Sequence, residues 1–107
     1  MSRKAIYLPQ GVFDSSGLTG SFQLAYTASD PIVVFKVIND SNVDVTLSTN
    51  GVANHDFVQS EGFFLYDLRA NRGREFDYLF PRGTQFFVTG AAGSGNIYFI
   101  ALTEQGL

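Results

Sequence analysis

The sequence predicts an all-β fold, an antiparallel β-sandwich of the jelly-roll kind with about seven or eight short strands. Turn residues such as Gly, Pro, Asn and Asp recur at short intervals, and the segments between them either alternate apolar and polar side chains or are apolar on both faces. No segment of convincing length shows the spacing of an amphipathic helix. A small barrel fits the same periodicity and remains the alternative.

The stretch 31–51 is expected to form the central part of the fold. Its second half, 43–48, alternates valine and leucine with Asp, Thr and Ser, so this strand has one face in the core and one in solvent. The strand before it, 32–38, is apolar on both faces except for Lys36, as in a central strand or in one that a partner covers. A tight polar turn at 39–42 is expected to join the two strands as a hairpin.

Further strands are expected before and after this hairpin, at 2–8, 22–26, 63–66, 85–89 and 97–103. On strand 22–26 the even-numbered residues are expected to be the buried ones. Asn50-Gly51 is the strongest short turn signal in the chain. The glycine-rich segment 90–95 is expected to be a hairpin connection, and 68–80 a long loop between sheets.

The composition indicates a small protein that contacts another protein. At 107 residues the chain is long enough for a single β-sandwich domain, 1–107, with one modest core. Hydrophobic residues make up 45% and charged residues 16% of the sequence, so part of the apolar surface is expected to meet a partner. An N-terminal arm over residues 1–12 is the alternative to the short strand at 2–8, and such arms often become ordered on a neighbouring molecule.

Several kinds of partner and site are not expected. The net charge of −3 argues against a nucleic-acid module held by phosphate contacts. Because the chain has no cysteine, it has no disulfide and no thiolate metal site. There is no run of about 18 apolar residues, so no membrane partner is expected and the chain is predicted to be soluble and made in a cytoplasm. No cofactor and no metal site are expected.

His55 and Asp56 are the one place where a histidine offers itself as a base or metal ligand. Such a role needs further partners from elsewhere in the fold, and a loop histidine that binds turn backbone is the favoured interpretation. The glycines at 90–95 invite comparison with a phosphate-binding loop, but a strand rather than a helix follows them. We therefore expect no catalytic residues and no enzyme.

Four of the seven basic residues gather in one loop region, at Arg69, Arg72, Arg74 and Arg82. Arginine forks suit carboxylates and phosphates, so this loop is a candidate contact to an acidic partner surface or a nucleic acid. Pairing with the acidic residues of the same loop, in contact with solvent, is the other interpretation and is slightly favoured.

Neighbouring aromatic residues at 63–64, 86–87 and 98–99 point to opposite faces of their strands. In a two-layer sandwich only one ring of each pair can enter the core. The outward ring belongs to an interface or a carbohydrate platform, or it leans under a loop; an interface is favoured, and a glycan platform is less favoured because Trp is absent. The candidate partner-binding residues are Arg3, Lys4, Ile6, Tyr7, Phe64, Arg69, Arg72, Arg74, Arg82 and Tyr98.

A spaced set of residues at turns and strand ends lies between Phe35 and Ile100. It consists of Val43, Val45, Ser48, Asn50, Gly51, His55, Asp56, Tyr66, Asp67, Asn71, Pro81, Gly83, Thr84, Val88, Gly90, Gly93, Gly95 and Tyr98. This pattern resembles small virion structural proteins of tailed bacteriophages. There a Ser-x-Asp-Gly turn, a His-Asp pair, a Tyr-Asp pair and a Gly-Thr precede the final hairpin, whereas this chain has Asn50 in place of the first Asp.

The resemblance implies a non-enzymatic virion structural protein, first of all a capsid decoration or cement protein that binds and staples neighbouring major capsid subunits. Its partners would be the major capsid protein or other virion proteins, in a homo-oligomer or another symmetric assembly. Its place would be the virion, after synthesis in the host cytoplasm. Two alternatives stay open, namely a ring-forming head-to-tail or tail component and a receptor- or glycan-binding β-sandwich module.

Overall fold

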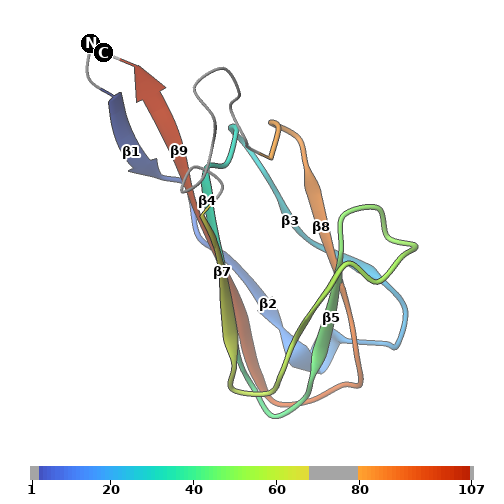
Figure 1. Cartoon of the computed structure of the whole chain (residues 1–107). Coiled ribbons are helices and arrows are strands. Elements are labelled where there is room, and N and C mark those ends of the chain that lie inside the picture. Colours follow the sequence, from blue (N-terminus) through green and yellow to red (C-terminus); the bar gives the residue numbers. More distant parts are fainter. Residues whose placement is uncertain (1–2, 68–79, 107) are drawn as a thin grey trace.

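Two antiparallel β-sheets packed face to face form the computed structural model, which describes residues 3–67 and 80–106 (Figure 1). Sheet A contains, in order, β1 (Arg3–Tyr7), β9 (Gly95–Gly106), β4 (Val34–Ser41) and β7 (Phe63–Asp67), and β2 (Gly11–Asp14) also pairs with β9. Sheet B contains β3 (Gln23–Thr27), β8 (Gln85–Thr89), β5 (Val45–Ser48) and β6 (Asp56–Val58). The predicted antiparallel β-sandwich is confirmed, and the described residues form nine strands.

Aromatic side chains from both sheets fill the space between them. Phe35 of β4 and Phe86 of β8 stack across the interior with their ring centroids 4.3 Å apart. Tyr26 of β3 stacks on Phe99 of β9 with a centroid distance of 5.7 Å. Burial of each phenylalanine contributes about 2–3 kcal/mol relative to the exposed side chain, so these rings are a main source of the attraction between the sheets.

The alternation read from the sequence is present on β5 and β9, and the central place expected for β4 is found as well. On β5, Val45 and Leu47 are buried. On β9, Phe99 and Ala101 enter the core, and Tyr98 lies on the opposite face of the sheet. Strand β4 lies between β9 and β7, as expected for a strand that is apolar on both faces.

The stretch 31–51 is not a hairpin, and the sequence-based expectation was wrong here. Strand β4 pairs with β7 and β9 in sheet A, whereas β5 pairs with β6 and β8 in sheet B. Residues 39–41 continue β4 rather than turning, and the chain crosses between the sheets at 42–44. The segment 90–95, also expected to close a hairpin, likewise leads from β8 in sheet B to β9 in sheet A.

The buried side chain of Asn39 gives the physical reason for this crossing. Its amide nitrogen lies 2.8 Å from the carbonyl oxygen of Val43, 3.1 Å from that of Val58 and 3.2 Å from that of Gln59. Ser41 Oγ donates a hydrogen bond to the Asn39 amide oxygen. Because a buried amide without partners costs free energy, the end of β4 is held against the crossing segment and against β6 in the other sheet.

Strand β3 contains an irregularity that the sequence pattern does not reveal. Its register with β8 shifts between Leu24 and Tyr26. As a result Ala25 and Tyr26 both pack against the core, while Leu24 is 49% exposed. The expectation that the even-numbered residues are buried is therefore wrong for Leu24, because one extra residue in a strand reverses the faces that follow it.

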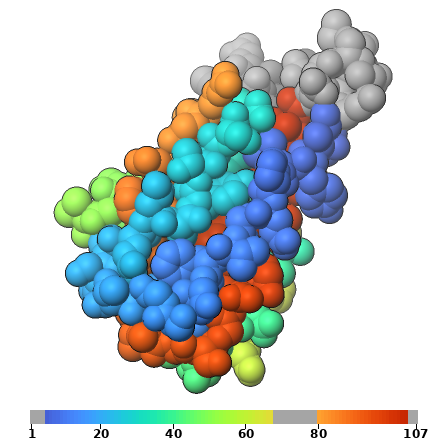
Figure 2. All heavy atoms as spheres, turned by 180° about the vertical axis from the view of Figure 1, so that it is seen from behind, coloured from blue at the N-terminus to red at the C-terminus, as the bar shows by residue number. Residues whose placement is uncertain are grey.

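The N-terminal segment is not a free arm. Strand β1 pairs with the C-terminal half of β9, from Arg3 opposite Gly106 to Tyr7 opposite Leu102, and the two strands form a ribbon that extends beyond the sandwich (Figure 1). In Figure 2 the N-terminal chain lies along the side of the molecule, beside β3. The Tyr26 hydroxyl donates to the carbonyl oxygen of Pro9 at 3.1 Å. The strand expected at 2–8 is thus confirmed as β1, and backbone pairing within the same chain takes the place of the expected free arm.

Residues 3–67 and 80–106 contain no helix with the length and hydropathy needed to cross a lipid bilayer. The one helical element in this part of the chain is a 3-10 turn, η1 (Ser15–Gly17).

Replacing Asn39 by Ala is predicted to destabilise the fold by about 3 kcal/mol, because buried carbonyl oxygens lose their donors. Urea denaturation followed by circular dichroism measures this change. Asn54→Ala is the matched control, since Asn54 is exposed, and its unfolding free energy is expected to change by less than about 0.5 kcal/mol. Equal midpoints for the two variants would contradict the role given to Asn39.

Candidate functional site

The outward side of sheet A carries a continuous band of apolar side chains, here called the apolar face. Its members are Tyr7, Val12, Val34, Ile38, Phe63, Leu65, Tyr98, Ile100 and Leu102. No described strand or helix lies over this side of the sheet. In Figure 1 the second layer, with β3, β8 and β5, lies on the other side of sheet A. Among these residues Tyr7 is 72% exposed and Phe63 70% exposed.

The strand register explains why these side chains adjoin. Val12, Tyr98, Ile38 and Phe63 stand directly opposite one another on β2, β9, β4 and β7, so they form one row across four strands. With strands about 4.8 Å apart, this row spans about 14 Å. A contiguous band of this kind differs from the single exposed apolar residues that are normal on protein surfaces, and it marks an interaction site.

One lysine and a few acidic groups set the charge of the apolar face. Lys36 lies in the middle row, between Ile100 and Leu65. Asp14 and Asp40 border one end, on either side of β9. The backbone N–H of Ser16 donates to the Asp14 carboxylate at 2.9 Å, and this bond lowers the pKa of Asp14 below its usual value. Asp67 lies in the next row, opposite Val34, so charges of both signs adjoin the apolar side chains.

The structure places the predicted partner-binding residues in different surroundings. Tyr7 and Tyr98 belong to the apolar face, and Ile6, on the ribbon, is 37% exposed. Arg3 and Lys4 are part of β1. Arg82 is exposed in the turn before β8, whereas Arg69, Arg72 and Arg74 lie outside the described residues, so the arginine contact stays a prediction.

Phe64 lies on the inward side of sheet A. It packs against the core, and its ring centroid is 6.4 Å from that of Phe35. The outward aromatic residue of β7 is Phe63. Sequence reasoning did not select Phe63 or Leu65, although their alternation with Phe64 was visible, because it does not show which side of a strand faces the second sheet.

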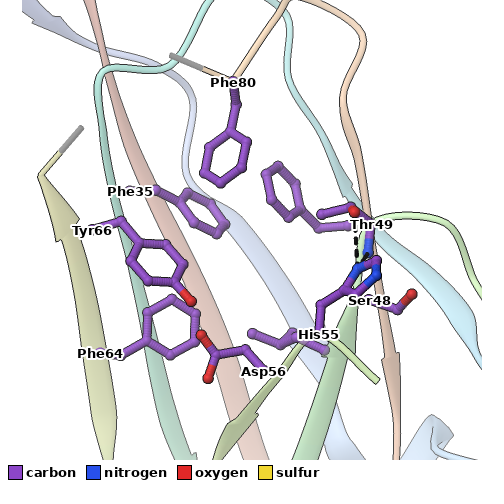
Figure 3. A pocket seen from close by; sticks show the side chains of 10 residues that line it. Phe35, Ser48, Thr49, His55, Asp56, Phe64, Tyr66 and Phe80 are labelled. Atoms are coloured by element: carbon purple, nitrogen blue, oxygen red, sulfur yellow. Dashed lines mark hydrogen bonds between the residues drawn. The ribbon is translucent and has the colours of Figure 1, made fainter. Parts of the chain in front are cut away.

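A cleft lined by aromatic rings opens between β7 and the segment 49–56 (Figure 3). Its volume is about 400 Å³. The rings that line it belong to Phe35, Phe64, Tyr66, Phe80 and Phe86. Phe80 meets Phe86 edge to face at a centroid distance of 5.2 Å, and Phe64 lies 4.8 Å from Tyr66. These rings come from both sheets, so the cleft exists only in the folded sandwich.

His55 has the structural role that the sequence favoured. Its Nδ1 accepts a hydrogen bond from the backbone N–H of Thr49 at 3.0 Å, and the backbone N–H of His55 donates to the carbonyl oxygen of Leu47 at 2.8 Å. The interpretation of His55 as a loop histidine that binds turn backbone is therefore confirmed. The ring also lines the cleft, opposite Phe64 and Tyr66 (Figure 3).

Asp56 is the acidic group of the cleft. It pairs with Leu47 in the β5–β6 ladder, so its side chain lies on the inward side of sheet B, where the neighbouring inward positions carry Val58 and Leu47. Its carboxylate accepts from the backbone N–H of Phe57 at 2.7 Å. A half-buried carboxylate thus stands among apolar side chains at the opening of the cleft.

The turn predicted at Asn50-Gly51 is confirmed and supports one wall of the cleft. The buried hydroxyl of Ser48 accepts from the backbone N–H groups of Asn50 and Gly51, at 3.2 and 3.0 Å. Asn50 Oδ1 in turn accepts from the N–H groups of Val52 and Ala53. Gly51 has φ +74°, a conformation that glycine adopts without strain. Asn50 uses its amide oxygen as the acceptor, the same role that an Asp carboxylate would have at this position.

Within residues 3–67 and 80–106, no three acidic or histidine side chains are arranged to hold a metal ion. Comparison of the sequence with protein-family models and with curated proteins finds no match. The function is therefore argued from the apolar face and the cleft.

Replacing His55 by Ala is predicted to lower the unfolding free energy by about 1 kcal/mol or less, because an exposed bond to one loop amide is lost. Ser48→Ala is expected to cost about 2 kcal/mol, because a buried hydroxyl that serves two turn amides is removed. Chemical denaturation compares the two variants. A larger loss for His55→Ala would show that the histidine has a role beyond the turn.

Proposed function

We propose that this chain is a non-enzymatic structural protein of a phage virion, a capsid decoration or cement protein that binds major capsid subunits through the apolar face of sheet A. The observation that carries the proposal is the continuous apolar row from Val12 to Phe63 on a sheet face that no described strand or helix covers. The pattern of turns and strand ends that resembles small virion proteins supports the choice of partner.

The physical argument begins with the cost of leaving the face in water. Phe63, Tyr7 and Leu65 are all more than half exposed. Contact with a partner removes this area from water at a gain of about 25 cal/mol per Å², and Lys36 at the centre restricts the partner to a surface with a carboxylate or carbonyl opposite it. This combination of apolar area and a few charges favours a specific protein partner over non-specific association.

The ribbon of β1 and β9 provides a second place of contact. It extends beyond the sandwich and carries Tyr7, which also belongs to the apolar face. A face on one capsid subunit and a ribbon on the next would engage two neighbours at once. The second contact then forms at high effective concentration, so weak individual contacts reinforce a shell of many copies.

The number of copies in the virion tests this function. Quantitative mass spectrometry of purified virions, with the major capsid protein as the reference, is expected to find one copy per capsid subunit or a fixed symmetric fraction of it. About a dozen copies would instead support a ring in the head-to-tail or tail region. Absence of the chain from purified particles would rule out the virion role.

The apolar face is tested by charged substitutions that leave the core intact. Phe63→Asp combined with Leu65→Asp is predicted to lower occupancy on capsids about tenfold or more, because two carboxylates enter the contact. Leu24→Asp combined with Phe57→Asp is the matched control, since these residues are 49% and 51% exposed on the outer face of sheet B. Circular dichroism checks that both variants fold. Equal occupancy of the two variants would exclude the apolar face as the contact.

A further inference from the structure

We infer that the aromatic cleft binds an organic cation, an ammonium or guanidinium group carried on an apolar stem. The stem enters among the rings and the charge stays at the opening beside Asp56. This inference concerns the inward side of the sandwich edge, on the opposite side of sheet A from the apolar face, and it does not depend on the virion role.

The rings supply the first part of the argument. Phe64, Tyr66 and Phe80 line the cleft above the fully buried Phe35; Phe80 meets Phe35 edge to face, and the rings of Phe64 and Tyr66 are tilted by 40° to each other. Aromatic faces attract cations through the ring quadrupole, most of all where water is partly excluded. A space of 400 Å³ is within the range of ligand pockets and is far larger than the packing voids of a protein interior.

Asp56 supplies the second part. Edge strands normally place apolar residues inward, and β6 does so at Val58. At Asp56 the inward position carries a carboxylate, of which one oxygen accepts from the Phe57 N–H and the other remains for a ligand. His55 uses Nδ1 as an acceptor for the Thr49 amide. Lysine and arginine are missing from the described residues that line the cleft, so its charge complements a cation.

The cleft is already formed and is open to solvent. Phe80 is held by two backbone hydrogen bonds to Ile32, of 2.8 and 2.9 Å, and Phe86 is buried beneath it. Tyr66 is 37% exposed and Asp56 is half-buried, so a ligand can reach both without displacing the core. Figure 3 shows Phe64 and Tyr66 on one side of the space, His55 and Thr49 on the other, and Asp56 between them. Preorganisation of this kind reduces the cost of binding.

An inward carboxylate on an edge strand has one other physical explanation, protection against edge-to-edge pairing with another chain. That explanation requires only a charge at Asp56. It requires neither rings around the charge nor any preference for a cation. The two explanations therefore differ in what a ligand titration of the folded protein will show.

The test is a titration of the isolated full chain, followed by 1H–15N NMR. Benzylamine, which is protonated at pH 7, is compared with neutral benzyl alcohol of the same size, and a capped Gly-Arg-Gly peptide is compared with its citrulline counterpart. The cations are expected to shift the amide signals of Phe57 and Thr49 and to bind about tenfold or more tightly than the neutral compounds. Tighter binding of benzylamine points to a free small-molecule ligand, and tighter binding of the arginine peptide to a side chain of a protein partner.

Variants locate the site. Asp56→Asn keeps the acceptor for the Phe57 amide and is expected to weaken cation binding about tenfold while leaving benzyl alcohol unchanged. Tyr66→Leu is expected to weaken binding of both probes. Asp40→Asn, which removes the same charge from the outer face of sheet A, is the control and is expected to have no effect. The inference is overturned if no cation shifts these signals, if neutral and cationic probes bind equally, or if Asp56→Asn binds the cations as the unmodified chain does.

Discussion

The buried amide of Asn39 is the interaction on which the arrangement of this protein depends. It joins the end of β4 in sheet A to the crossing segment at Val43 and to Val58 and Gln59 at the end of β6 in sheet B. By composition alone, the segment 39–42 is typical of an ordinary hairpin turn, in which the side chain of Asn39 would lie in solvent. The amide of this sheet A residue instead donates to carbonyl oxygens of the crossing segment and of the end of β6 in sheet B, so the chain changes layers and the two sheets stack rather than extend each other.

Stacking of the two sheets also determines which surfaces remain for function. A two-layer sandwich buries one face of each sheet. In sheet B the outer face is mixed, with Thr46 and Thr89 beside the exposed Phe57. In sheet A the outer face carries apolar side chains in three successive rows, with Lys36 in the middle row and Asp67 at the β7 end of the third. Much of the exposed apolar surface is thus gathered on one sheet face that no described element covers, which is the basis of the proposed role in an assembly.

The edge of the sandwich combines two features that sequence reasoning treated separately. The aromatic residues were considered as interface candidates, and His55-Asp56 as a turn. The β5–β6 ladder places Asp56 on the inward side, opposite Leu47, and β7 brings Phe64 and Tyr66 to the same space. Turn chemistry and ring packing then produce a preformed cleft with one carboxylate, although neither feature by itself indicates a binding site.

The sequence by itself determined the fold class, the inward face of β5, the two sides of β9 and the turn at Asn50-Gly51, because these depend on side-chain alternation and on bonds between near neighbours. Tertiary structure decided what lies beyond that range. The crossing after Asn39, the bulge at Leu24 and the pairing of β1 with β9 all require partners far away in the chain. The apolar face and the cleft also depend on such distant partners. The alternation along one strand determines only which of its side chains lie on the same side. The pairing of strands then decides which side chains of different strands become neighbours.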